Sequence, residues 1–194
     1  AADASFVMAD IPGLIVGAAE GAGLGAQFLR HLSRTRVLLH LVDVVPEDAS
    51  DPIDNALAIE AELMQYSEAL AQRPIWIALS KVDQLEADAL DQMLQEFAQT
   101  FPDRPIYAVS SLGDIGLPEL CNDLMLALQQ QQSLLQENSE FAEQQKRLEE
   151  RISDDVWAHS ERMRRRGEPS LQTAADVTDD YVDDEGVEVV YVPD

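Results

Sequence analysis

Short apolar runs that alternate with helical patterns are the feature that most constrains the fold of this chain. Val37-Leu-Leu-His-Leu-Val42 is apolar except for one histidine and shows no alternation. Such a run is typical of a strand that is covered on both faces, as in a parallel sheet. We expect strands at 4–9, 37–42, 74–80 and 106–110. None of these runs is long enough to span a membrane.

Helical periodicity follows each of the four runs. Asp51-Pro52 marks one helix start, because aspartate caps the first turn and proline is tolerated at the first helical position. We expect helices at about 24–34, 51–71, 86–100 and from Leu117 onward. Strand and helix repeated four times predict an α/β domain, a parallel sheet with flanking helices.

The carboxyl-terminal third has a different composition. Residues 137–166 are rich in Glu, Gln and Arg, which predicts either a solvated helix outside the domain or a partly helical linker. We place this charged helical linker at 133–171. Residues 172–194 hold eight acidic residues and no Lys or Arg, which is typical of a disordered acidic tail. We therefore divide the chain into a domain at 1–132, the linker and the tail.

Charge and cysteine content limit the partners and the compartment. The net charge of −24 opposes broad contact with nucleic acid, but Arg162–Arg166 form a local basic cluster that could meet RNA phosphates. A solvated helix face whose charge offsets the acidic tail explains this cluster equally well. The single Cys121 excludes an internal disulfide framework, and there is no signal pattern. We expect a cytoplasmic monomer.

Polar residues follow three of the predicted strands at their carboxyl ends, where an open α/β sheet binds its ligands. The three groups are Asp10-Ile11-Pro12-Gly13, Ser80-Lys81-Val82-Asp83 and Ser110-Ser111-Leu112. In the first group, the Asp10 carboxylate could hold Mg²⁺ directly or through water, and the Gly13 N–H could approach a phosphate. Asp43, after the remaining strand, has no clear task and is interpreted as a turn or capping residue.

The second and third groups suit a guanine base. A carboxylate at Asp83 could accept hydrogen bonds from N1–H and the exocyclic amine of guanine, a donor pair that adenine lacks. The Lys81 stem could lie over the purine ring, and N–H groups at Ser110–Leu112 could meet the guanine carbonyl. Taken singly, each group also fits a capped turn, a surface ion pair or a polar turn.

The order of the groups resembles the second half of a P-loop GTPase domain. In detail, Asp10-Ile-Pro-Gly-Leu-Ile-x-Gly-Ala-x-Glu-Gly-Ala-Gly-Leu-Gly25, then Phe28-Leu-x-His31 and Val37-Leu-Leu-His-Leu-Val-Asp43, closely resemble the Obg (CgtA) family of bacterial GTPases. This resemblance covers residues 4–128. Glu185-Gly-Val-Glu-Val-Val-Tyr191 is similar to the carboxyl-terminal extension of proteobacterial members.

The resemblance implies a protein that binds GTP and GDP, hydrolyses GTP slowly and associates with the large ribosomal subunit during its assembly. It implies that Asp10 holds Mg²⁺ through a water and that the Gly13 N–H meets the γ-phosphate. Residues 14–25 would be a switch that orders with GTP. The implied GTP-binding residues are Asp10, Ile11, Pro12, Gly13, Ser80, Lys81, Val82, Asp83, Ser110, Ser111 and Leu112.

Three departures from the GTPase pattern matter. Ser80 stands where the guanine motif usually has asparagine, which we expect to weaken nucleotide binding. Leu14 stands where Ras-like proteins place a water-orienting glutamine, so the catalytic residue stays unknown. No G-x-x-x-x-G-K-[ST] loop occurs in the 194 residues, and Ala1 is not methionine, so we expect a fragment. The alternative is a degenerate guanine-binding or protein-interaction module without catalysis.

The missing loop predicts that these 194 residues alone are marginally stable and do not hydrolyse GTP. The strand that leads to this loop belongs between 4–9 and 37–42, so its absence leaves strand edges unpaired. Phosphate release from GTP in the presence of Mg²⁺ measures the activity. Turnover at the rate expected for an intact GTPase would refute this prediction.

Overall fold

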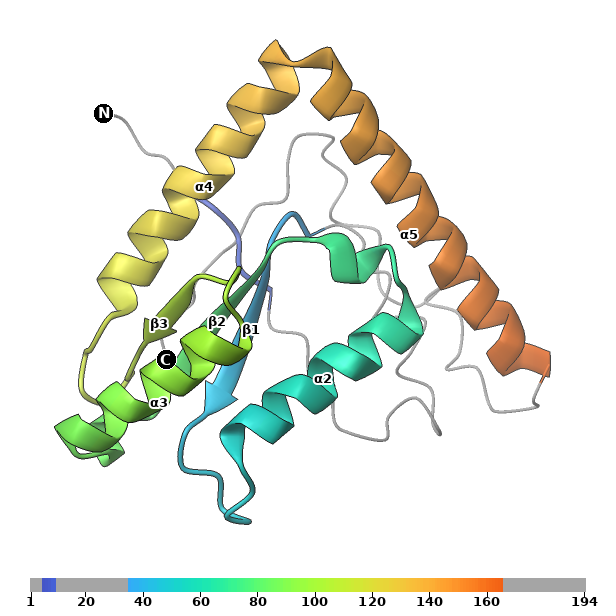
Figure 1. Cartoon of the computed structure of the whole chain (residues 1–194). Helices are drawn as coiled ribbons and strands as arrows, with labels where there is room; N and C mark the ends of the chain where they lie inside the picture. The colour runs from blue at the N-terminus through green and yellow to red at the C-terminus, as the bar shows by residue number, and fades with distance from the viewer. Residues whose placement is uncertain (1–4, 10–34, 166–194) are drawn as a thin grey trace, which may run out of the picture.

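The computed structural model describes residues 5–9 and 35–165. It contains a sheet of three parallel strands in the order β1-β2-β3. The strands are β1 (Leu38–Asp43), β2 (Ile75–Ser80) and β3 (Ile106–Ala108). The predicted α/β fold, a parallel sheet with flanking helices, is confirmed (Figure 1).

Helices follow the strands in the predicted alternation. Single-turn 3₁₀ helices occur at η2 (Leu70–Gln72) and η3 (Val82–Gln84). The α-helices are α2 (Pro52–Tyr66), α3 (Ala87–Thr100), α4 (Leu117–Glu137) and α5 (Ser139–Arg165). The helix expected at about 24–34 lies outside the described residues. Within the described part of the chain, no helix has both the length and the apolar character needed to cross a membrane.

Local sequence explains where α2 begins and ends. The Asp51 side chain accepts hydrogen bonds from the N–H groups of Ile53 (2.7 Å) and Asp54 (3.3 Å), and proline occupies the first turn. At the other end, Ser67 is extended, and its hydroxyl accepts from the Leu70 N–H at 3.0 Å. The helix therefore stops at Tyr66 rather than at residue 71.

β2 is the central strand and contributes side chains to both faces of the sheet. Ile77 and Leu79 pack with the inner faces of α2 and α3, where Phe97 is fully buried. Trp76 and Ala78 pack on the opposite face, with apolar residues of α4 such as Leu120 and Leu124. This alternation places α2 and α3 on one side of the sheet and α4 on the other.

Residues 5–9 are not a strand, so the prediction of a strand at 4–9 is wrong for these residues. No backbone ladder hydrogen bond is formed by them within the described part. An extended segment without a neighbouring strand leaves its backbone groups unpaired, which removes the stabilisation that a sheet provides. Phe6 still packs against the α4 side of the core.

β1 and β3 also differ from the sequence prediction. β1 pairs only with β2 in the described sheet, and Leu41 is 62% exposed, so the strand is not covered on both faces. β3 ends at Ala108 rather than at residue 110, because Ser110 instead forms an isolated antiparallel bridge with Ile115. His40 is half-buried in β1.

α5 packs onto the domain, so the prediction of a solvated helix outside it is wrong for one face. Ile152 is fully buried, and Leu148 and Val156, four residues to either side, pack against the same cluster. That cluster also contains Leu63, Tyr66, Ala69, Leu70 and Ile75 from the end of α2 and the start of β2. Three apolar positions in a charged helix are enough to bury it along one stripe.

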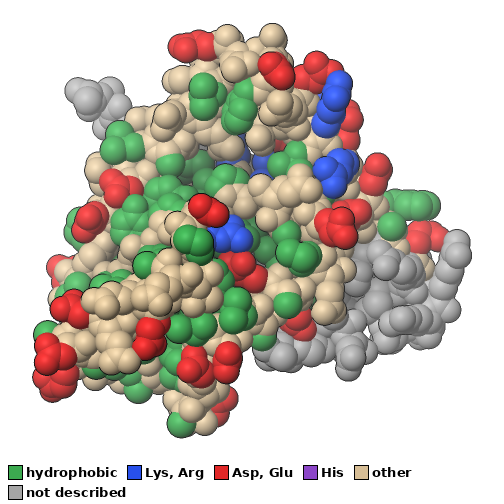
Figure 2. Space-filling view, viewed as in Figure 1, with side chains coloured by type: hydrophobic (Ala, Val, Ile, Leu, Met, Phe, Trp, Pro, Cys, Tyr) green, Lys and Arg blue, Asp and Glu red, His purple; other side chains and the backbone are tan. Residues whose placement is uncertain are grey.

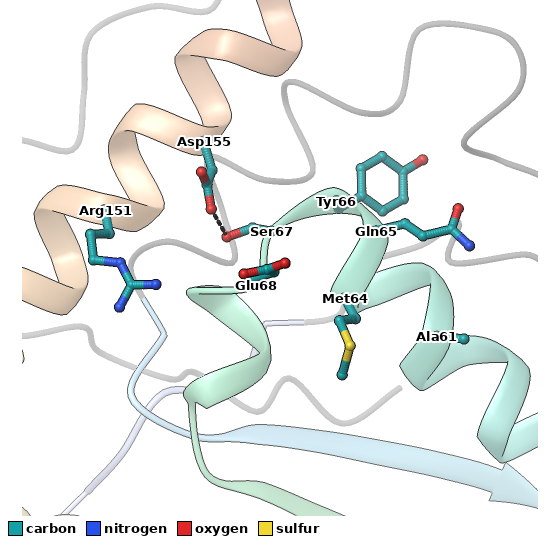
Figure 3. A pocket seen from close by; sticks show the side chains of 8 residues that line it. All are labelled: Ala61, Met64, Gln65, Tyr66, Ser67, Glu68, Arg151 and Asp155. Carbon is teal, nitrogen blue, oxygen red and sulfur yellow. Dashed lines mark hydrogen bonds between the residues drawn. The ribbon is translucent and has the colours of Figure 1, made fainter.

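Polar contacts support this packing. The buried Arg73 side chain donates to Gln145 at 3.2 Å and lies 3.7 Å from the Glu149 carboxylate, both on α5. The Ser67 hydroxyl donates to Asp155 at 2.5 Å (Figure 3). α4 and α5 form the two arms of an inverted V (Figure 1), and α4 crosses residue 132 without a break. The domain boundaries proposed from the sequence stay predictions.

We predict that Ile152→Ala lowers the free energy of unfolding by about 3 kcal/mol, because it removes buried methyl groups and leaves a cavity. Trp157→Ala on the same helix is the control, since that side chain is 68% exposed. Urea denaturation measures both. An equal, small effect of the two substitutions would show that α5 does not pack on the domain in solution.

Candidate functional site

The polar residues predicted after the strands gather at the carboxyl edge of the sheet. Asp43 and Ser80 end β1 and β2 and face each other in the parallel register. η3 follows β2 directly and contains Asp83, while Ser110 comes two residues after β3. Parallel strands end on the same edge, and this edge is where open α/β sheets bind ligands.

Asp83 is held by the loop after β3. The Ser110 hydroxyl donates a short hydrogen bond to Oδ1 of Asp83, and the same hydroxyl accepts from the Gly113 N–H at 2.8 Å. Ser110 is 2% exposed, whereas Asp83 is exposed. One carboxylate oxygen is therefore fixed in direction by a buried side chain while the carboxylate group remains accessible.

The loop from Ser110 to Gly116 is closed tightly. Ser110 and Ile115 exchange two backbone hydrogen bonds of 3.0 Å. Gly116 has a φ of +69°, and a Cβ there would lie 2.1 Å from the Ala108 carbonyl oxygen, so only glycine fits. Leu112 stands at the tip and is 88% exposed. Ser111 is also exposed, so these two residues are accessible to a ligand on the surface.

Lys81 and Val82 have different roles in the loop after β2. Lys81 adopts a left-handed backbone conformation, with φ 65° and ψ 28°, and is exposed. Val82 is only 3% exposed and packs in the core beside Ile77 and Leu79. Its side chain anchors the loop, so only its backbone is available to a ligand.

Asp43 is the residue whose place in this site the sequence interpretation missed. Its Oδ2 lies 2.5 Å from the Lys81 ammonium, and its Oδ1 accepts from the Val45 N–H at 2.9 Å. The second contact confirms the predicted turn role, but the ion pair was not foreseen. The only available signal was the common position of Asp43 and Lys81 after neighbouring strands.

The charges of this pair support each other. Burial acts to raise the pKa of Asp43, but hydrogen bonds from Lys81 and Val45 and the lysine charge outweigh it, so the pKa lies below its usual value. The hydrogen bond to Asp43 raises the pKa of Lys81, and the charges of Asp43 and Glu47 add to this shift. Both groups are therefore ionised at neutral pH.

Ser80 uses its hydroxyl within the sheet. The group donates to the Val42 carbonyl at 3.1 Å and so joins the ends of β1 and β2. Ser80 is half-buried, and its own carbonyl accepts from the Val44 N–H at 3.2 Å. The side chain thus stabilises the strand end and has no further donor hydrogen for a ligand.

The residues predicted to bind phosphate and Mg²⁺ are not among those that the structure describes. Asp10, Ile11, Pro12 and Gly13 are outside the described residues, as are the switch residues 14–25. Within 5–9 and 35–165, no three His, Cys, Asp or Glu side chains are grouped as metal ligands. The side chains of Arg162–Arg166 are also outside the described part.

Comparison with known protein families indicates which class of reaction this site belongs to. A family described as 50S ribosome-binding GTPase matches residues 1–81. The match supports a GTPase. It includes the whole Asp10–Gly13 group and ends at Lys81, in the loop after β2. At this general level, it supports a GTP-binding protein and GTP hydrolase of the TRAFAC type.

We predict that Ser80→Asn increases the affinity for GDP. The serine hydroxyl is engaged by Val42, whereas an asparagine amide has a second donor hydrogen for the base or the surrounding loops. Calorimetric titration of wild type and variant with GDP compares the two dissociation constants. No gain in affinity with asparagine would refute the idea that serine weakens the site.

Proposed function

We propose that this chain is part of an Obg-type GTPase that binds guanine nucleotides, hydrolyses GTP slowly and acts in assembly of the large ribosomal subunit. The observation that carries the proposal is the grouping of Lys81, Asp83 and Ser110 at one edge of the sheet. The GTPase family match over residues 1–81 supports guanine nucleotides as the ligand class.

Asp83 is the proposed guanine-recognition residue. Ser110 orients its carboxylate through Oδ1, and no hydrogen bond to Oδ2 is formed within the described part of the chain. A carboxylate accepts hydrogen bonds from both N1–H and the exocyclic amine of guanine, whereas adenine has no matching donor pair. The exposed loop at Ser111–Leu112 would cover the base, and the stem of Lys81 would lie against its ring.

The proposed phosphate side comprises Asp10–Gly13 and the switch at 14–25, which the family match includes. We propose that Asp10 holds Mg²⁺ through a water, because a hard cation with phosphate ligands prefers oxygen donors. When bound, such an ion would neutralise charge on the phosphates. Leu14 lacks a polar group to orient a water, which supports slow intrinsic hydrolysis.

The ribosomal role is supported by the resemblance to Obg proteins and by the match to a family of 50S ribosome-binding GTPases. Figure 2 shows acidic side chains over much of the visible face, in line with the net charge of −24. A surface of this charge repels RNA phosphates. We therefore propose that any RNA contact is confined to the cluster Arg162–Arg166. We also propose that the protein acts in the cytoplasm.

A guanine-binding module without catalysis is the second candidate. The engagement of the Ser80 hydroxyl by the Val42 carbonyl favours it, since this position then contributes little to the nucleotide. Both candidates share the guanine site and differ in whether GTP is hydrolysed.

We predict that Asp83→Asn changes the preferred base from guanine to xanthine. Asparagine offers one donor and one acceptor, which match the C2 carbonyl and N1–H of xanthine but not the two donors of guanine. The ratio of GDP to XDP affinity should fall at least about tenfold, since an unmatched polar group is costly.

Asp88→Asn in the first turn of α3 is the matched control, because it removes the same charge from an exposed residue that has no hydrogen bond to the Ser110 loop. Titrations of each 194-residue variant with GDP, XDP and ADP provide the measurement. A wild-type chain that binds ADP as well as GDP would refute the proposed guanine site.

A further inference from the structure

Asp43 occupies a place in the site that no family match or motif assigns. It ends β1, between Val42 and Val44, which are 4% and 5% exposed. The Val44 N–H also donates to the Ser80 carbonyl at 3.2 Å. The backbone on both sides of Asp43 is therefore fixed by the core and by β2.

The carboxylate itself is also oriented. Its Oδ1 accepts from the Val45 N–H at 2.9 Å, which leaves Oδ2 to meet the Lys81 ammonium at 2.5 Å. Two different partners use the two oxygens, so the side chain cannot rotate without losing one of them. Asp43 is thus a fixed anion at the edge of the proposed base site.

Lys81 is constrained at both ends of its side chain. Its left-handed backbone is uncommon for a residue with a Cβ and is held by hydrogen bonds of the next turn, from the Gln84 N–H to its carbonyl at 3.0 Å and from the Val82 N–H to Val109 at 3.4 Å. Such backbone conformations concentrate at functional sites. Asp43 fixes the other end, the ammonium.

We infer that Asp43 is a positioning residue that holds the Lys81 side chain in place as one wall of the nucleotide base site. The inference rests on the proposed function. An exposed ion pair contributes little to stability, and the two side chains are 46% and 34% exposed. The ion pair therefore acts mainly by holding the long, flexible Lys81 side chain in one place. Because this side chain is ordered before the nucleotide binds, less conformational entropy is lost on binding.

The direction in which Asp43→Asn changes nucleotide affinity distinguishes this positioning role from a purely electrostatic one. Removing a negative charge beside an anionic nucleotide should by itself strengthen binding. Releasing Lys81 should weaken it. Asp43→Asn keeps an oxygen for the Val45 N–H but loses the charge, so we expect about threefold weaker binding of both GDP and uncharged guanosine, with an unchanged melting temperature.

Asp48→Asn is the matched control. Asp48 lies in the same loop and accepts from the Ser50 N–H at 3.0 Å, and it has no contact with Lys81. Its substitution removes the same charge and should leave nucleotide affinity unchanged or slightly stronger. The dependence on Lys81 is tested in a Lys81→Met background, where Asp43→Asn should no longer weaken the binding of uncharged guanosine.

The experiment uses the full 194-residue chain, with NMR titrations of GDP, ADP and guanosine. Weaker guanosine binding in Asp43→Asn, absent in the Lys81→Met background, supports the inference. A wild-type chain that prefers GDP to ADP, combined with unchanged or tighter binding by Asp43→Asn, overturns the inference alone. A wild-type chain without preference for GDP overturns the proposed function and the inference with it.

Discussion

The structure depends on the hydrogen bonding of β2 to a parallel neighbour on each side. All residues from Ile75 to Leu79 are buried, and the two core faces meet at this strand. Backbone hydrogen bonds to β1 and β3 fix the register of β2, and this register also fixes where the residues after β2 lie. Lys81 and Asp83 lie directly after β2, so their positions are set by the central, buried strand of the sheet.

The same strand links the candidate site to the packing of α5. At its amino-terminal end, buried Arg73 precedes β2 and contacts Gln145 and Glu149 of α5. The hollow in Figure 3 lies at the end of α2 and is lined by Ala61, Met64, Gln65, Tyr66, Ser67, Glu68, Arg151 and Asp155. The candidate site is at the other end of the strand. α5 therefore stabilises the fold without contacting the proposed base site.

The sequence predicted the elements that depend on local pattern. Uninterrupted apolar residues predicted β2, and the Asp51-Pro52 cap predicted the start of α2. The strand at 4–9 was not formed over 5–9, because a strand requires a partner that local sequence cannot supply. The buried face of α5 was missed because three apolar residues, spaced by four, stand among many charges.

The sequence predicted which residues form the candidate site better than it predicted which of them contact one another. Motif order gave Lys81, Asp83 and Ser110, and the structure brings Asp83 and Ser110 into contact. The pairing of Asp43 with Lys81 depends on strand register and on a left-handed backbone at a residue that is not glycine. Neither is visible in a single sequence, since each results from tertiary structure rather than from residue spacing.

The central claim is that the carboxyl edge of β2 and β3 recognises guanine. Amide chemical shifts of the full chain, followed during titration with GDP and with ADP, test it most directly. We predict that GDP shifts the amides of Lys81–Asp83 and Ser110–Gly113 and that ADP does not. Equal shifts with both nucleotides, or shifts confined to the residues that line the hollow at the end of α2, would contradict the claim.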